Sequence, residues 1–119
     1  MKIVQTFTDS DGNSVMEEIE MDFETSEFIP GHAPLGVSPT SIAQTAKFLQ
    51  MADGWESGWH PTPVRQYVVV LTGDWSLETG DGQVRVIRPG EVVLLEDTTG
   101  RGHFMTFSRD TSLFAVALD

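Results

Sequence analysis

Apolar and polar positions alternate along much of this chain, which is the pattern of β-strands that bury one face. The strongest example is VRQYVVVL at Val64–Leu71, a β-branched and aromatic run that ends at Gly73. The same criteria predict further strands at residues 2–8, 14–23, 44–52, 74–79, 83–88, 91–95, 102–107 and 113–118. Residues 44–52 fit a helix or a strand, and the strand is favoured because the segment is short and lies between turn-rich stretches.

Turn residues separate these strands at intervals of about 8–12 residues, the spacing of an all-β sandwich or barrel. Asp9–Asn13 is a turn cluster, so residues 2–8 and 14–23 are expected to form an N-terminal hairpin, with a bulge in the second strand. Gly80-Asp81-Gly82 and Pro89-Gly90 are further turns. Residues 24–43 are rich in proline and glycine and predict a long connection, with one helical turn after Ser38.

We therefore expect one all-β domain over residues 1–119, with the hairpin and long loop in 1–43 and a barrel in 44–119. A hydrophobic content of 39% is that of a globular protein. The absence of cysteine excludes disulfides and thiolate chemistry. No apolar run is long enough to span a bilayer, and the first residues lack the features of a signal peptide, so a cytoplasmic location is expected.

The charge of the chain narrows the range of partners. Its formal net charge is −11, from 18 acidic residues against 7 lysines and arginines. Nucleic-acid binding needs a basic face, so this class of protein is excluded, and anionic membranes are disfavoured. Many of the acids lie between residues 9 and 27, where we interpret them as a solvated strand face. The alternative is an acidic docking surface.

Two histidines flank strand blocks that could meet in the fold. Side chains two positions apart on a strand share a face. One such set is His60, Thr62, Gln66 and Val68. A second set is His103, Met105 and Phe107. If the fold brings the sets together, they form an apolar cavity with a few polar groups, which is typical of small-molecule sites. Arg65 and Tyr67 have the opposite parity and are expected to face away from it.

These residues carry a family resemblance. The chain resembles the cupin superfamily of small double-stranded β-helix, or jelly-roll, barrels. The positions of the first cupin motif read His60, Thr62, Gln66 and Gly73, and those of the second read Pro89, Gly90, Glu91 and His103. Residues 96–102, EDTTGRG, are similar to a stretch in a group of small bacterial cupins. The resemblance covers residues 59–107 well and the N-terminal third poorly.

The resemblance implies a site inside the barrel that often holds iron, manganese, zinc or nickel. In this chain it implies His60 and His103 as imidazole ligands and Gln66 as an amide ligand in place of a carboxylate. Thr62 stands where the family has a second imidazole, and threonine is a poor ligand. Whether a divalent metal binds is therefore left open. Without metal, His60 and His103 could act as general acid and base. Substrate would contact Thr62, Gln66, Val68, Met105 and Phe107.

Each of these residues also has a structural interpretation. His103 could cap a loop, His60 could pack at the barrel mouth, and Gln66 could satisfy a buried neighbour. His32 is expected in an exposed loop, and the alternative is that this loop covers the barrel mouth.

The acidic pair before the second histidine has its own interpretation. Glu96 and Asp97 are expected to pair with Arg101 or Arg65. A catalytic Asp97 is disfavoured, because nothing in the sequence buries it or gives it a partner.

Three functions compete. The first is an enzyme of the isomerase, cyclase or lyase type that uses histidine acid–base chemistry on a small organic molecule. The second is a metal-dependent dioxygenase, and the third is a protein that binds a small ligand without turning it over. A homodimer is expected from the resemblance, and the N-terminal hairpin is too small to be stable alone.

Overall fold

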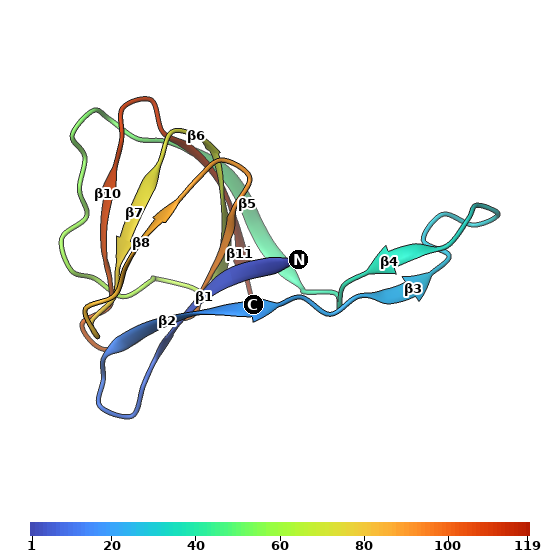
Figure 1. The fold of residues 1–119 in the computed structure, drawn as a ribbon, viewed down its shortest axis with the longest axis horizontal. Coiled ribbons are helices and arrows are strands. Elements are labelled where there is room, and N and C mark those ends of the chain that lie inside the picture. The colour runs from blue at the N-terminus through green and yellow to red at the C-terminus, as the bar shows by residue number, and fades with distance from the viewer.

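The computed structural model describes residues 1–119 and contains strands but no helix (Figure 1). The structure thus contains no helix that could span a membrane. The strands are β1 (Lys2–Thr8), β2 (Ser14–Glu20), β3 (Glu24–Ser26), β4 (Leu35–Val37), β5 (Ala43–Gln50), β6 (Gln66–Thr72), β7 (Trp75–Glu78), β8 (Val84–Ile87), β9 (Val92–Leu95), β10 (Phe104–Phe107) and β11 (Ser112–Leu118). The all-β prediction is confirmed, and the strand predicted at residues 44–52 is present as β5, which ends at Gln50.

The largest element is a six-stranded sheet in the order β2-β1-β9-β6-β11-β5. The predicted N-terminal hairpin is confirmed, with β1 and β2 in continuous register from Lys2↔Glu20 to Thr8↔Ser14 and without the expected bulge. In its turn, the Asp9 carboxylate accepts hydrogen bonds from the backbone N–H groups of Asp11 and Asn13. Strand β1 also pairs in parallel with β9, so the hairpin is an integral part of the large sheet.

A three-stranded sheet, β10-β7-β8, faces the large sheet (Figure 1). The predicted hairpin turn at Gly80-Asp81-Gly82 joins β7 to β8. Burial opposes ionisation of Asp81, but hydrogen bonds from Thr79 and Gln83 outweigh it and lower the pKa of the Asp81 carboxyl. The carboxylate thus fixes the turn that sets the register of β7 against β8.

The two sheets do not close into the predicted barrel. Apart from two isolated bridges, Glu56↔Thr106 and His60↔His103, pairing stays within each sheet. Only a few bonds join β2 to the β7–β8 hairpin: the Asp81 N–H donates to the Ser14 carbonyl, the Gln83 side-chain amide donates to the Met16 carbonyl, and Arg85 pairs with Glu18 at 2.8 Å. The all-β class is confirmed, but closure into a barrel depends on edge pairing that the strand pattern does not specify.

The core lies between the two sheets. It consists of alternate residues of the facing strands, as period-2 patterning requires. Its buried members are Val4, Met16, Val68, Val70, Trp75, Leu77, Ile87, Val93, Leu95, Leu113 and Ala115. A second, smaller cluster of Ile3, Leu94 and Leu118 lies on the opposite face of the large sheet. The large sheet is therefore apolar on both faces.

Residues 21–42, which we call the arm, differ from the prediction. In place of a loop with a helical turn after Ser38, they contain a two-stranded hairpin of β3 and β4 that projects away from both sheets (Figure 1). Residues 38–42 form no helical turn, because Thr40, Ser41 and Ile42 favour helix weakly, and they lead directly into β5. His32 is exposed and lies between β3 and β4, as expected. Because the arm projects away from both sheets, its loop does not cover the mouth between them (Figure 1).

Burial within β8 gives a test of this core. Replacing Ile87, which is 0% exposed, by alanine should lower the free energy of unfolding by about 2–5 kcal/mol through lost burial and the cavity left behind. The matched change Val84→Ala, in the same strand but 61% exposed, should change it by less than about 0.5 kcal/mol. Urea unfolding of both variants measures the difference, and equal effects would contradict the described packing of β8.

Candidate functional site

A cavity of about 230 Å³ lies between the two sheets. Nine of its ten lining residues are hydrophobic, and the tenth is Gln66 at the start of β6. The lining comprises Leu49, Met51, Trp55, Gln66, Val68, Trp75, Leu95, Met105, Phe107 and Leu113. Trp55 is partly exposed and packs against Phe107 with ring centroids 5.5 Å apart. The hollow is thus an apolar pocket with a single amide in its wall.

The residues predicted for the site divide into two groups. Gln66, Val68, Met105 and Phe107 line the cavity. His60, Thr62 and His103 do not line it but form a polar cluster beside it. The predicted parity of β6 holds, because Tyr67 packs in the apolar cluster on the opposite face of the sheet.

The two histidines are held side by side by backbone bonds. The His60 N–H donates to the His103 carbonyl at 3.0 Å, and the His103 N–H donates to the His60 carbonyl at 2.9 Å. Their ring centroids are 4.8 Å apart. Gly102 permits this approach: its φ is +78°, and a Cβ there would lie 2.0 Å from the His60 carbonyl carbon. The sequence therefore needs glycine immediately before His103.

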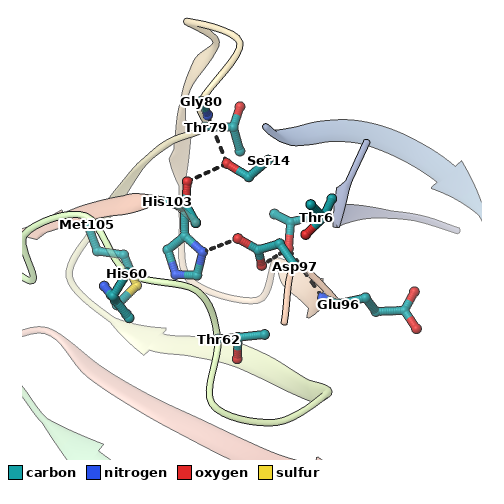
Figure 2. A network of polar contacts seen from close by, with 12 residues as sticks. Thr6, Ser14, His60, Thr62, Thr79, Gly80, Glu96, Asp97, His103 and Met105 are labelled. Carbon is teal, nitrogen blue, oxygen red and sulfur yellow. Dashed lines mark hydrogen bonds and ion pairs between the residues drawn. The ribbon is translucent and has the colours of Figure 1, made fainter. Parts of the chain in front are cut away.

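Asp97 has the burial and the partners whose apparent absence in the sequence disfavoured a role for it. It is fully buried, and its carboxyl accepts a hydrogen bond from the Thr6 hydroxyl at 2.7 Å and contacts His103 Nδ1 at 2.6 Å. Figure 2 shows the His103 ring between the Asp97 carboxyl and His60. Thr6 lies on β1, ninety-one positions earlier in the chain, so no local pattern revealed this partner.

The Asp97 contact determines what His103 can do. If the neutral ring donates its Nδ1 hydrogen to Asp97, its Nε2 carries a lone pair. That Nε2 is buried and has no hydrogen-bond partner. His60 has its own Nδ1 contact, to the Gly58 carbonyl at 3.1 Å. Each imidazole thus has one nitrogen held by the protein, while the other has no hydrogen bond within the chain.

Thr62 connects this polar cluster to the cavity. Its hydroxyl donates to the Val64 carbonyl at 2.7 Å and accepts a hydrogen bond from Gln66 Nε2 at 3.0 Å. Its N–H donates to the Asp97 carbonyl. Because Thr62 holds the amide nitrogen of Gln66, the amide oxygen of Gln66 is left as a hydrogen-bond acceptor for a guest.

The charged residues near the site pair in part as predicted. Arg65 forms an ion pair with Glu96 at 2.6 Å, which confirms one of the expected pairings. Arg101 does not pair with a carboxylate; its guanidinium lies over the Trp59 ring, 3.8 Å from the centroid. Asp97 takes Thr6 and His103 as partners in place of an arginine.

The residues present fit a metal only in part. The chain contains no group of three or more His, Asp or Glu side chains arranged to hold an ion. The two adjacent imidazoles fit a pair of nitrogen ligands, and the Asp97 contact to the remote nitrogen of His103 is a common arrangement behind a ligating histidine. Gln66 would have to supply a third, weaker donor.

Comparison with solved structures shows a likeness of the fold. The fold is similar to the crystal structure of protein NMB1881 from Neisseria meningitidis, with a TM-score of 0.50 and 21% sequence identity. The match covers 69% of this chain and 84% of that chain. No protein-family model and no curated protein matches the chain. At this identity the likeness concerns the fold alone.

The role assigned to Asp97 can be tested by NMR. In the neutral His103 ring, nitrogen-15 shifts should show hydrogen on Nδ1 and none on Nε2. Asp97→Asn should shift the ring toward the other tautomer, because an amide can donate to Nδ1, and should cost about 1.5–3 kcal/mol of stability. The control Glu96→Gln, in the same segment, should leave the His103 signals unchanged. Hydrogen on Nε2 in the unmodified protein would refute the assignment.

Proposed function

We propose that this protein binds a small, largely apolar organic molecule in the cavity between the two sheets, with Gln66 as its polar anchor. The observation that carries the proposal is the cavity itself, about 230 Å³ with nine of ten lining residues hydrophobic. Small-molecule sites combine such a lining with a few placed polar groups. The amide oxygen of Gln66 would accept a hydrogen bond from a hydroxyl or amine of the guest.

The volume and lining limit the guest. Apolar cavities of about 150 Å³ hold a benzene-sized molecule, so this one suits a single ring or a short branched chain. The lining contains no charged side chain, so a strongly charged guest would lose its hydration without compensation. An uncharged molecule with one hydroxyl or N–H group fits best.

We also propose that the fold is a variant of the cupin jelly roll. Three observations support this: two facing sheets of mainly antiparallel strands, the spacing of His60, Thr62, Gln66 and Gly73, and the contact between His60 and His103. The open edges at β2 and β8 depart from a closed barrel. In this interpretation, the cavity occupies the place of the family's internal site.

Acid–base catalysis of the isomerase, cyclase or lyase type is a second candidate, favoured by the Asp97–His103 contact. A carboxyl on Nδ1 would orient the imidazole and leave Nε2 as a base, as in other histidine-dependent sites. Nε2 is buried and does not line the cavity, so a substrate would reach it only after the residues that cover it had moved. Binding without turnover therefore has more support.

A divalent metal is a separate proposal, and a dioxygenase would depend on it. His60, His103 and Gln66 would hold the ion. When bound, such an ion would polarise an oxygen of the guest as a Lewis acid. Two imidazoles and an amide are fewer strong donors than catalytic sites usually supply, so the dioxygenase has the least support of the three functions.

Binding of phenol and toluene tests the main proposal. Both rings fit the cavity, and phenol adds one hydroxyl. NMR titration should show both bound, with phenol preferred about tenfold through its hydrogen bond to Gln66. Gln66→Leu should abolish the preference and retain toluene. Absence of binding by either compound, or an unchanged preference in the variant, would contradict the proposal.

Calorimetric titration with Zn²⁺ tests the metal proposal. Untagged, dialysed protein should bind the ion stoichiometrically, and His60→Ala should bind it far more weakly because one imidazole is lost. His32→Ala, which removes the exposed histidine of the arm, is the matched control and should bind as the unmodified chain does. Unfolding midpoints verify that each variant is folded. The metal proposal fails if the unmodified protein does not bind the ion, or if His60→Ala binds it as tightly as the unmodified protein does.

A further inference from the structure

The segment that follows β5 closes the side of the molecule between the edge strands β5 and β10. Residues 52–58, which we call the strap, leave the large sheet after β5 and run along the outer side of β10 (Figure 1). Backbone bonds fix both ends of the strap. Just before it, the Met51 N–H donates to the Thr111 carbonyl at 2.9 Å, and near its far end the Ser57 N–H donates to the Met105 carbonyl at 3.0 Å. The strap therefore lies over the opening between the two sheets on this side.

Trp55, in the middle of the strap, borders both the cavity and the solvent. Its side chain lines the cavity and is 41% exposed. The other nine lining residues are buried or half-buried. Of all the side chains around the cavity, that of Trp55 therefore separates it most directly from solvent.

The contacts that hold Trp55 against the body of the protein are few. Its ring packs on Phe107 with centroids 5.5 Å apart. The buried Trp75 also stacks on Phe107, so Phe107 has one tryptophan from the core and one from the strap. The neighbouring Asp53 forms an ion pair with Arg109, but both side chains are largely exposed and such pairs contribute little. Between its fixed ends, the strap is thus held mainly by the Trp55 ring.

Glycines stand on both sides of Trp55. Gly54 and Gly58 have φ angles of +73° and +67°. The Trp55 N–H donates to the Ala52 carbonyl at 3.0 Å, which makes residues 52–55 a tight turn with Gly54 at its third position. Glycine adopts left- and right-handed conformations about equally readily, and hinges are positions that absorb such changes. The strap can therefore move at these two glycines while its ends stay bonded.

We propose that Trp55 is the gate of the cavity, and that it determines how fast a guest enters and how long a guest can be. The inference rests on the proposed binding of a small apolar molecule in this cavity. With the Trp55 ring on Phe107, the mouth is covered and the guest is shielded from water. When the ring turns outward with the strap, a path opens between β5 and β10. A guest with a tail longer than the cavity keeps the gate from closing and is bound more weakly.

Association rates from NMR line-shape analysis of the full chain test the gate, with toluene as the probe. Trp55→Ala should raise the association rate about tenfold, because the cover of the mouth is removed, and should raise the dissociation rate at least as much. Trp55→Phe keeps a ring against Phe107 and should give an intermediate association rate. Phe48→Ala, which removes a 75% exposed ring that does not line the cavity, is the control and should leave both rates unchanged. Circular dichroism verifies that each variant is folded.

Pentylbenzene tests the limit on length. Its chain can extend through the open mouth of Trp55→Ala, so this variant should bind it about tenfold more tightly than the unmodified protein does. Equal affinity of the two proteins for pentylbenzene would contradict the limit that the gate sets.

The rates separate a gate from a side chain that only contacts the guest. Loss of a contact changes the dissociation rate, whereas loss of a gate changes the association rate as well. An association rate in Trp55→Ala equal to that of the unmodified protein would overturn the gate and leave the proposed function intact. Toluene that binds neither the unmodified protein nor Trp55→Ala would overturn the proposed function and the gate together.

Discussion

The six-stranded sheet must bury apolar side chains on both of its faces, and the other features of the molecule follow from this requirement. Its inner face meets the three-stranded sheet, and their interdigitated side chains form the main core. Its opposite face, which we call the outer face, carries the smaller buried cluster of Ile3, Leu94 and Leu118. One sheet thus contributes to two separate apolar clusters.

Incomplete filling of the inner face creates the candidate site. The cavity remains where the side chains of the two sheets do not meet, and Gln66 at the start of β6 brings one amide into its wall. Beside it, backbone hydrogen bonds join His60 to His103 and Thr62 to Asp97, and the side chains of Asp97 and His103 are in contact. Thr62 also accepts a hydrogen bond from the Gln66 side chain, so the polar cluster orients the amide that lines the cavity.

Strand positions were predictable because period-2 alternation and turn residues are local signals, as at Val64–Leu71 and Gly80–Gly82. The side of β6 that faces the cavity followed from the same alternation. The surroundings of Asp97 were not predictable, because its hydrogen bond with Thr6 depends on the pairing of strands that are distant in the sequence. The arm was missed because short strands in a proline- and glycine-rich segment give a weak pattern. The prediction of a closed barrel was wrong, because the alternation of apolar and polar residues does not specify which edge strands pair.

The account depends most directly on an apolar hollow behind the inner face of the large sheet. Xenon enters such cavities, and methyl NMR can follow it residue by residue. Under xenon pressure, the methyl signals of Val68, Leu113 and Met105, which line the cavity, should shift strongly. Those of Val69 and Val116 on the outer face should shift little. Equal small shifts on both faces would show that the hollow is filled, and would contradict the account.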